Sequence, residues 1–217
     1  MTKENKENYR QLLIDKIEGL VEQREVTIGT IKTTYLLCGN GKPVIFLHGA
    51  GAGAVTWYPS INTISKNFQV VAPDIVGYGE SDKPDAPYNR PYFSNWLKSM
   101  ANRFNSRYIL HKPINRDPNH SSYSIAVLKY KGGKNAFKQG RGTAVSKISE
   151  ELLKQIENET LIIWGKDDKL FPVEYGEAAA KIIPNAKLHL IQNAGHLPLM
   201  DQPEIFNKIL DDFLKSE

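Results

Sequence analysis

Cysteine is almost absent from this sequence, and long apolar runs are absent altogether. The 217 residues include one cysteine, Cys38, so no disulfide can form within the chain and a reducing compartment is expected. No stretch approaches the ~20 consecutive apolar residues that a membrane-spanning helix needs. The opening residues, MTKENKENYR, have no apolar run of the kind found in a signal peptide. We therefore expect a cytoplasmic protein with no membrane partner.

Positive charge is concentrated in one part of the chain. From Lys98 to Lys154 there are twelve lysines and arginines against three acidic residues, and the rest of the chain is slightly acidic. Such a segment can bind nucleic acid or an anionic surface, but it is more often a solvated stretch of chain. It has no zinc-ligand spacing and no helix-turn-helix or RNP-like pattern. We therefore do not expect nucleic acid as a partner.

Short apolar runs bounded by turn residues predict a buried parallel sheet. Two short strands are expected within residues 24–37, with a turn at Gly29, and Gly39 to Gly41 form a second turn. Buried strands are expected at residues 43–47, 68–72, 161–164 and 187–191. Amphipathic or helix-compatible patterns lie at residues 5–23, 55–66, 93–104, 149–156, 174–183 and 203–214. This alternation predicts an α/β protein with parallel pairing.

A glycine-rich loop directly follows the first buried run. It reads HGAGAGA over residues 48–54, and its small residues let backbone N–H groups approach a ligand closely. Such N–H groups can stabilise a developing oxyanion or hold a phosphate. The dinucleotide pattern G-x-G-x-x-G is not met, because Ala54 stands in the place of its last glycine. No Lys-Ser/Thr pair follows, as a P-loop would require.

An aspartate and a histidine follow the third and fourth buried runs. Asp168 ends the string WGKDD, and His196 lies in the string NAGHLP. In parallel sheets functional groups gather at the carboxyl ends of strands, and an acid there can orient a histidine and stabilise its cation. Each residue alone has an ordinary explanation, as a turn cap or a solvated loop residue. Their order, each behind its own strand, favours an acid–base pair.

Four motifs in this order resemble the α/β-hydrolase superfamily. They are HGAGAGA (residues 48–54), DIVGYGESDKP (74–84), WGKDD (164–168) and NAGHLP (193–198). The tail DQPEIFNKILDDFL is also typical of the group that includes the meta-cleavage-product carbon–carbon hydrolases. The resemblance covers residues 25–95 and 140–214. It implies a reduced α/β-hydrolase-like, mostly parallel sheet flanked by helices, with a small irregular lid.

The resemblance also implies roles for single residues. Asp168 matches the acid of the family's catalytic triad, and His196 matches its base. One oxyanion N–H comes from the loop that contains Gly49, Ala50 and Gly51. The family acts on small molecules and needs no cofactor, and the spacing of the acid and the histidine does not form a metal-ligand set.

One expected motif is missing. The family's nucleophile sits in G-x-S-x-G on a strand-to-helix turn, and chain order places it between Pro84 and Leu161. No G-x-S-x-G occurs anywhere in the sequence. The nearest string, around Ser81, belongs to the DIVGYGESDKP motif, and the proline after it disfavours the helix that an elbow requires. We expect neither Ser81 nor Cys38 to act as a nucleophile.

The interval between residues 84 and 161 is too short for the family's elements there. Each parallel crossover needs about a dozen residues or more, so we predict a deletion of the elbow strand, its helix and the next strand. Residues 1–97 and 148–217 would form the two parts of the core, and 98–147 a lid-like segment. The strand at 44–47 would then lie beside that at 161–164. The sheet could close up as a smaller parallel sheet, or stay partly unpaired and form a homo-oligomer.

Several functions follow from this pattern, and the sequence leaves open whether the protein is an enzyme. The first is a carbon–carbon or ester hydrolase impaired by loss of the serine elbow. The second is a catalytically silent remnant or minimised scaffold with a binding role. The third is acid–base chemistry by His196 and Asp168 without a covalent step. The fourth is anion or nucleic-acid binding by the basic segment.

Overall fold

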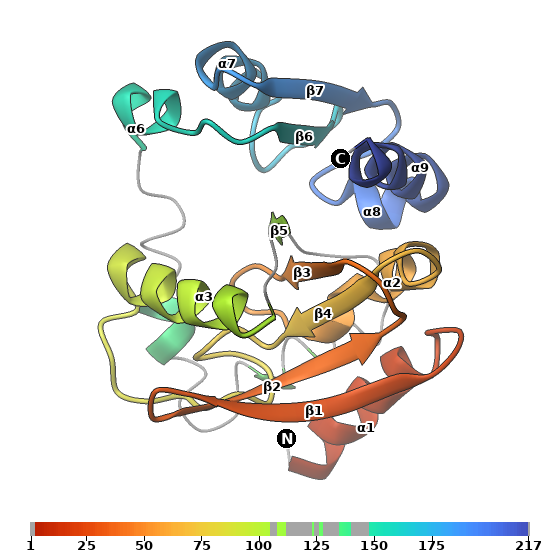
Figure 1. Ribbon diagram of the computed structural model, residues 1–217, viewed down its shortest axis with the longest axis vertical. Coiled ribbons are helices and arrows are strands. Elements are labelled where there is room, and N and C mark those ends of the chain that lie inside the picture. Colours follow the sequence, from red (N-terminus) through yellow and green to blue (C-terminus); the bar gives the residue numbers. More distant parts are fainter. Residues whose placement is uncertain are drawn as a thin grey trace. The chain divides into compact units, whose positions relative to one another are not determined.

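The chain contains two compact units, and the boundary between them lies between Val145 and Ser146. The computed structural model describes residues 3–104, 108–111, 123, 126–127, 135–139 and 148–216. Figure 1 shows the elements of both units. None of the helices in these described ranges is both long and apolar enough to cross a bilayer.

The first unit contains a five-stranded sheet with the strand order β1-β2-β4-β3-β5 (Figure 1). The first two strands pair antiparallel, and β4 pairs antiparallel with β2 and parallel with β3. The fifth strand pairs parallel with β3. The bounds are β1 Val21–Ile28, β2 Ile31–Cys38, β3 Pro43–Leu47, β4 Gln69–Pro73 and β5 Tyr108–His111. The α/β fold class and the hairpin around Gly29 are therefore confirmed.

Helices cover both faces of this sheet. Alternate residues of β3 face opposite sides, so Ile45 packs in a cluster with Trp96 of helix α3, while Phe46 lies 5.0 Å from the ring of Trp57. This explains the continuous apolar run of β3, which is buried from Val44 to Leu47. The bounds of the helices before β5 are α1 Lys3–Ile14, the 3-10 helix η1 Ala54–Trp57, α2 Tyr58–Ile64 and α3 Arg90–Phe104, and residues 135–139 are also helical.

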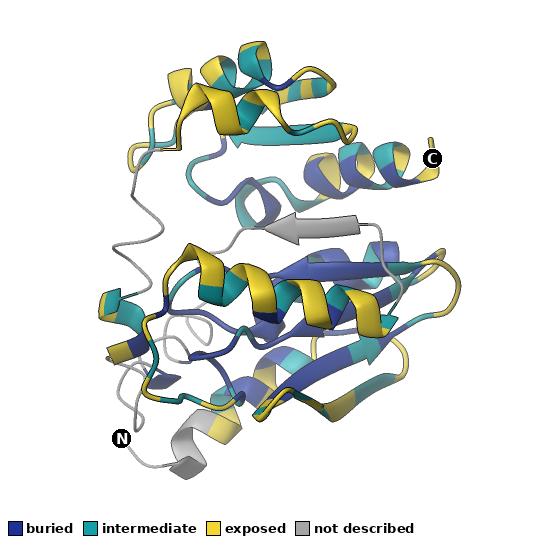
Figure 2. Cartoon of the chain, turned by 60° about the vertical axis from the view of Figure 1, so that its left-hand side comes forward, coloured by how far each residue is buried: buried dark blue, intermediate teal, exposed yellow. Residues whose placement is uncertain are grey.

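Over residues 148–216, the second unit has two parallel strands and four helices. The predicted strands are present as β6 and β7, but they are less buried than expected. Side chains of β6 are half-buried from Thr160 to Trp164, and those of β7 alternate between half-buried and exposed (Figure 2). A two-stranded sheet gives each side chain only one neighbouring strand. The bounds are α6 Glu150–Lys154, β6 Thr160–Gly165, α7 Glu174–Ile182, β7 Ala186–Ile191, α8 Pro198–Asp201 and α9 Pro203–Lys215.

The predicted neighbour of β3 is wrong. Residues 161–164 were expected beside this strand, but they pair with β7, and β5 occupies the edge of β3 with Val44 opposite Tyr108. A strand therefore follows α3 directly, where chain order places the elbow strand. Buried backbone groups of β3 need partners, and the run YILH at residues 108–111 supplies them. Residues 98–104 extend α3, and the lid-like role of 98–147 stays a prediction, since much of this segment lies outside the described residues.

The first predicted helix is too long. Helical spacing suggested residues 5–23, whereas α1 ends at Ile14 and β1 begins seven residues later. After Ile14 the chain turns, with the Ile17 amide donating to the Ile14 carbonyl at 2.8 Å, and Gly19 has a left-handed φ of +91° that no continuing helix would have. The Asn62 side chain holds this connection, because its Oδ1 accepts from the Glu18 amide at 2.7 Å and its Nδ2 donates to the Lys16 carbonyl at 3.1 Å.

The turn at Gly39 should tolerate no side chain. Gly39 and Gly29 both have left-handed backbones, with φ of +77° and +63°. A β-carbon at Gly39 would overlap the carbonyl oxygens of Ser65 and Phe68, whereas one at Gly29 would meet nothing within 4 Å. Gly29→Ala should lower the free energy of unfolding by about 1–2 kcal/mol, the cost of the left-handed backbone. Gly39→Ala should lower the free energy of unfolding at least about twice as much, because the backbone at Ser65 and Phe68 must also move. Urea denaturation measures both, and equal losses would contradict the steric argument.

Candidate functional site

The glycine-rich loop is fixed at its start by His48. The Nε2 atom of His48 accepts a hydrogen bond from the Ile75 amide at 2.9 Å, and Nδ1 donates to the Gly49 carbonyl at 2.7 Å. A backbone N–H only donates and a carbonyl only accepts, so the ring is the neutral tautomer with its proton on Nδ1. Both ring nitrogens are engaged, and His48 therefore holds the loop in place.

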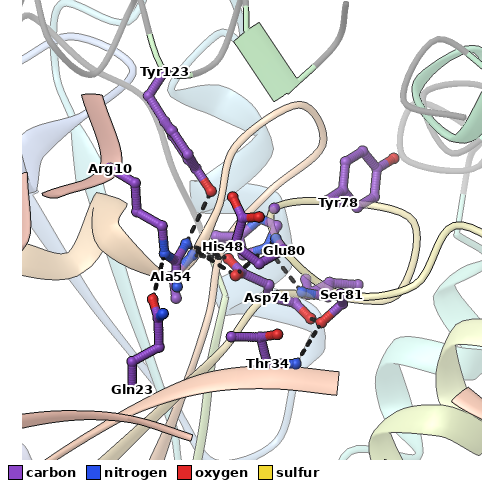
Figure 3. Close-up of polar contacts among 12 residues, drawn as sticks. Arg10, Gln23, Thr34, His48, Ala54, Asp74, Tyr78, Glu80, Ser81 and Tyr123 are labelled. Carbon is purple, nitrogen blue, oxygen red and sulfur yellow. Dashed lines mark hydrogen bonds and ion pairs between the residues drawn. The ribbon is translucent and has the colours of Figure 1, made fainter. Parts of the chain in front are cut away.

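The end of the loop is fixed by the buried carboxylate of Asp74 (Figure 3). Its Oδ1 accepts from the Ala54 amide at 2.7 Å, and its Oδ2 lies 2.9 Å from the Arg10 guanidinium. Burial alone would raise the pKa of Asp74, but the charge of Arg10 and hydrogen bonds from backbone amides lower it. The carboxylate is therefore ionised and anchors the first residue after the loop.

The middle of the loop contains the three residues expected at the oxyanion position. Gly51 has a φ of +82°, so its left-handed backbone explains a glycine there. The Ala52 amide donates to the Gly49 carbonyl at 3.3 Å, which closes a tight turn around Ala50. The structure thus brings Gly49, Ala50 and Gly51 together directly after β3, and their contribution to an oxyanion site stays a prediction.

Ser81 is a structural residue of the neighbouring loop. Its hydroxyl donates to the Asp74 carbonyl at 2.6 Å and accepts from the Thr34 amide at 2.9 Å. The residue is 2% exposed. Cys38 is buried on β2. These contacts give Ser81 a structural role, and the expectation that neither side chain is the nucleophile stays a prediction.

Asp168 and His196 form a hydrogen-bonded pair in the second unit. The Nδ1 atom of His196 lies 2.9 Å from Oδ2 of Asp168, and the two side chains are 20% and 2% exposed. Because β6 and β7 are parallel neighbours, the loops after them lie together. Two backbone bonds join these loops, from the Lys166 amide to the Ile191 carbonyl and from the Asp167 amide to the Ala194 carbonyl, both at 2.9 Å.

The glycines of this region permit that close approach. A β-carbon at Gly165 would overlap the carbonyl oxygens of Ala194 and Gly195. The Gly195 amide in turn donates to Oδ2 of Asp201 at 2.8 Å, so helix α8 closes the loop that carries His196. The strings WG and AGH are therefore needed for the packing of the two loops as well as for chemistry.

The environment of Asp168 fixes the tautomer of His196. Oδ1 of Asp168 accepts from the amides of Leu170 and Phe171 at 2.8 and 3.0 Å. Burial alone would raise the pKa of Asp168, but the Phe171 amide, His196 and the Leu170 amide outweigh it and lower this pKa. An ionised carboxylate only accepts, so Nδ1 of His196 carries a proton, and in the neutral ring the lone pair is then on Nε2. Within residues 148–216, no group bonds Nε2.

Two residues of the site escaped prediction from the sequence. Arg10 and Tyr123 both contact the buried region next to the glycine-rich loop (Figure 3). The one available signal was an arginine near the apolar stripe of α1, and that is too common to interpret. Among the described residues, no three His, Cys, Asp or Glu side chains gather as a metal site would require. The basic segment lies largely outside the described residues.

Comparison with known proteins places this geometry among hydrolases. The family model of the alpha/beta hydrolase fold matches residues 42–114 and 103–203. The 2-hydroxy-6-oxo-6-(2'-aminophenyl)hexa-2,4-dienoic acid hydrolase of Metapseudomonas resinovorans is 23% identical over 279 residues, which covers 95% of this chain and 96% of that protein. The 2-hydroxy-6-oxo-2,4-heptadienoate hydrolase of Pseudomonas putida is 24% identical over 268 residues, with 89% and 96% covered.

A solved structure shows the same fold. Carboxylesterase CesB from Bacillus subtilis superposes with a TM-score of 0.85 at 18% identity, and the match covers 99% of each chain. The predicted resemblance to the superfamily, and to the carbon–carbon hydrolases within it, is confirmed by these matches. Both sequence alignments are longer than the 217 residues of this chain, so each of those relatives has segments without a counterpart here.

The lowered pKa of Asp168 makes the second unit sensitive to acid. Its ionised form contributes stability fully above the unfolded pKa, about 4, and this contribution is lost as the pH falls through the lower pKa of the folded protein. We expect Asp168→Asn to weaken the dependence of the urea midpoint on pH below about 4. Its exposed neighbour is the matched control, and Asp167→Asn should leave that dependence unchanged. An unchanged profile in Asp168→Asn would contradict the assigned charge state.

Proposed function

Because the chain belongs to the alpha/beta hydrolase fold family, we propose that it is a carbon–carbon or ester hydrolase whose serine-dependent chemistry is impaired. The observation that carries this proposal is the His196–Asp168 pair, which has the geometry of a general base and its acid in a sequence without G-x-S-x-G. The substrate is a small molecule, and neither a cofactor nor a metal takes part. A cytoplasmic location and a homo-oligomer stay predictions.

The pair can act as a general base. Nε2 of His196 accepts a proton from a hydroxyl or a water, and the carboxylate of Asp168 stabilises the imidazolium that forms. Such proton transfer accelerates reactions by about 10²–10⁴-fold. Gly49, Ala50 and Gly51 are proposed to supply the oxyanion N–H. Their support is indirect, from the two anchored ends of the loop at His48 and Asp74.

The serine hydroxyl that His196 would deprotonate is missing from its expected place in the sequence. β5 follows α3, as the elbow strand should, but the chain continues with Lys112 and Pro113 instead of a serine between glycines. The residue before a proline is disfavoured in helical conformation, so an elbow is not expected here. Without its nucleophile, a triad enzyme retains about 10³–10⁴-fold catalysis over water.

The comparisons support loss of an internal segment. Residues 103–114 match the family pattern twice, once at the end of the first matched stretch and once at the start of the second. Two separate parts of the pattern thus meet at one short stretch of this chain. The alignments with the two hydrolases leave parts of those proteins without a counterpart. A deletion between the two halves of the core produces both observations.

A catalytically silent remnant with a binding role is the second candidate. The missing serine motif favours it, since the remaining pair would have only water or a substrate proton to act on. Both candidates predict the same fold, and they differ in whether His196 matters for any turnover. Activity measurements on matched histidine variants therefore separate them.

We expect weak hydrolysis of an activated ester such as p-nitrophenyl acetate, and a rate lowered by about 10²-fold or more in His196→Ala. His189→Ala is the matched control, because His189 is an exposed histidine of β7 in the same unit, and its rate should equal that of the parent protein. Initial rates by absorbance give the measurement. Activity that survives His196→Ala would remove the pair from the mechanism, and no activity in any variant would favour the silent remnant.

Fluorophosphonate labelling tests the missing nucleophile directly. A serine activated by a histidine reacts with this probe, whereas a structural serine does not. We expect no label on the protein, measured by intact mass, because no serine lies in a G-x-S-x-G motif and the hydroxyl of Ser81 is buried in two hydrogen bonds. A stoichiometric label that disappears in His196→Ala would reveal an activated hydroxyl and contradict the proposed impairment.

A further inference from the structure

Arg10 is a buried cation that joins three separate parts of the first unit. Its side chain is 4% exposed and extends from α1 (Figure 3). Nε donates to Oε1 of Gln23 on β1 at 2.8 Å, and Nη1 donates to the hydroxyl of Tyr123 at 3.0 Å. Nη1 also lies 2.9 Å from Oδ2 of Asp74. Arginine presents several donors in a fixed fork, so one side chain here fixes groups from positions 23, 74 and 123.

The carboxylate that Arg10 holds is the same one that holds the glycine-rich loop. Oδ1 of Asp74 accepts from the Ala54 amide at 2.7 Å, and Oδ2 accepts from the Glu80 amide at 3.0 Å. Removal of one partner from a buried ion pair leaves an uncompensated charge, which then moves, binds water or takes up a proton. Each of those responses weakens the bond from Asp74 to Ala54.

Tyr123 and Asp74 also pack against the backbone of the loop at Gly53. A β-carbon placed on Gly53 would lie 2.5 Å from the Tyr123 hydroxyl and 2.8 Å from Oδ1 of Asp74. Arg10 bonds to both of these groups. The two side chains that confine the end of the loop are therefore both fixed by one guanidinium.

We propose that Arg10 is a positioning residue for the glycine-rich loop, which it holds in place through Asp74 and Tyr123. Helix α1 is then part of the supporting structure of the site, although it lies before all the family motifs in the sequence. The functional meaning rests on the proposed role of residues 49–51 in hydrolysis. The positioning itself does not, and it is measured without any activity.

Native-state hydrogen exchange of the Ala54 amide tests the positioning. In Arg10→Met, exchange of this amide should accelerate by at least about tenfold more than that of the protected amides of β4, because the loop opens locally. Arg10→Lys keeps the charge beside Asp74 but loses the fork, and it should restore part of the protection. NMR or mass spectrometry of exchanged samples gives both rates in one experiment.

Two further variants separate positioning from general stability. Leu13→Ala removes a fully buried side chain from the same helix and should accelerate exchange at Ala54 and in β4 by the same factor. Arg24→Met removes an exposed arginine that pairs with Glu22 and should change neither. Parallel acceleration of Ala54 and β4 in Arg10→Met would overturn the proposal, since Arg10 would then act only on overall stability. Absence of ester hydrolysis in every variant would count against the proposed function alone.

Discussion

The carboxylate of Asp74 is surrounded by donors from distant parts of the sequence, and the arrangement of the first unit around its loops depends on it. Arg10 from α1 and the amides of Ala54 and Glu80 converge on its two oxygens. A buried carboxylate is costly unless it is paired and hydrogen-bonded. The glycine-rich loop, the turn that contains Ser81 and the first helix are therefore held by a shared requirement to satisfy one charge.

In the second unit, the carboxylate of Asp168 is likewise satisfied by several donors, but in a different geometry. Asp168 satisfies one oxygen with the amides of Leu170 and Phe171, and this leaves the other oxygen for His196. The parallel pairing of β6 and β7 brings the two loops together, and Gly165 allows their backbones to touch. A structural requirement, the pairing of two strands, thus places an acid beside a base.

Features set by local sequence were predictable, and features set by distant contacts were not. The hairpin at Gly29, strand β3 and the pairing of Asp168 with His196 follow from turn residues, apolar runs and ordered motifs. The end of α1 was missed because the apolar spacing continues to Leu20 and Val21, whereas the helix ends at Ile14 and the chain turns before β1. Strand β5 was missed because a four-residue run shows no period of its own. Arg10 was missed because its three partners lie far from it in the sequence.

The glycine-rich loop in the first unit and the loops of Asp168 and His196 in the second are each held by contacts within their own unit. This explains why both keep their structure under the proposed deletion. The contacts that fix the glycine-rich loop come from His48, Asp74, Arg10 and Tyr123, all within the first unit. The bonds that fix His196 come from Asp168 and Asp201, both within the second. Each set of contacts lies within one unit. Under the proposed deletion, the chain would lose the reacting group while each unit keeps the contacts that shape its own loops.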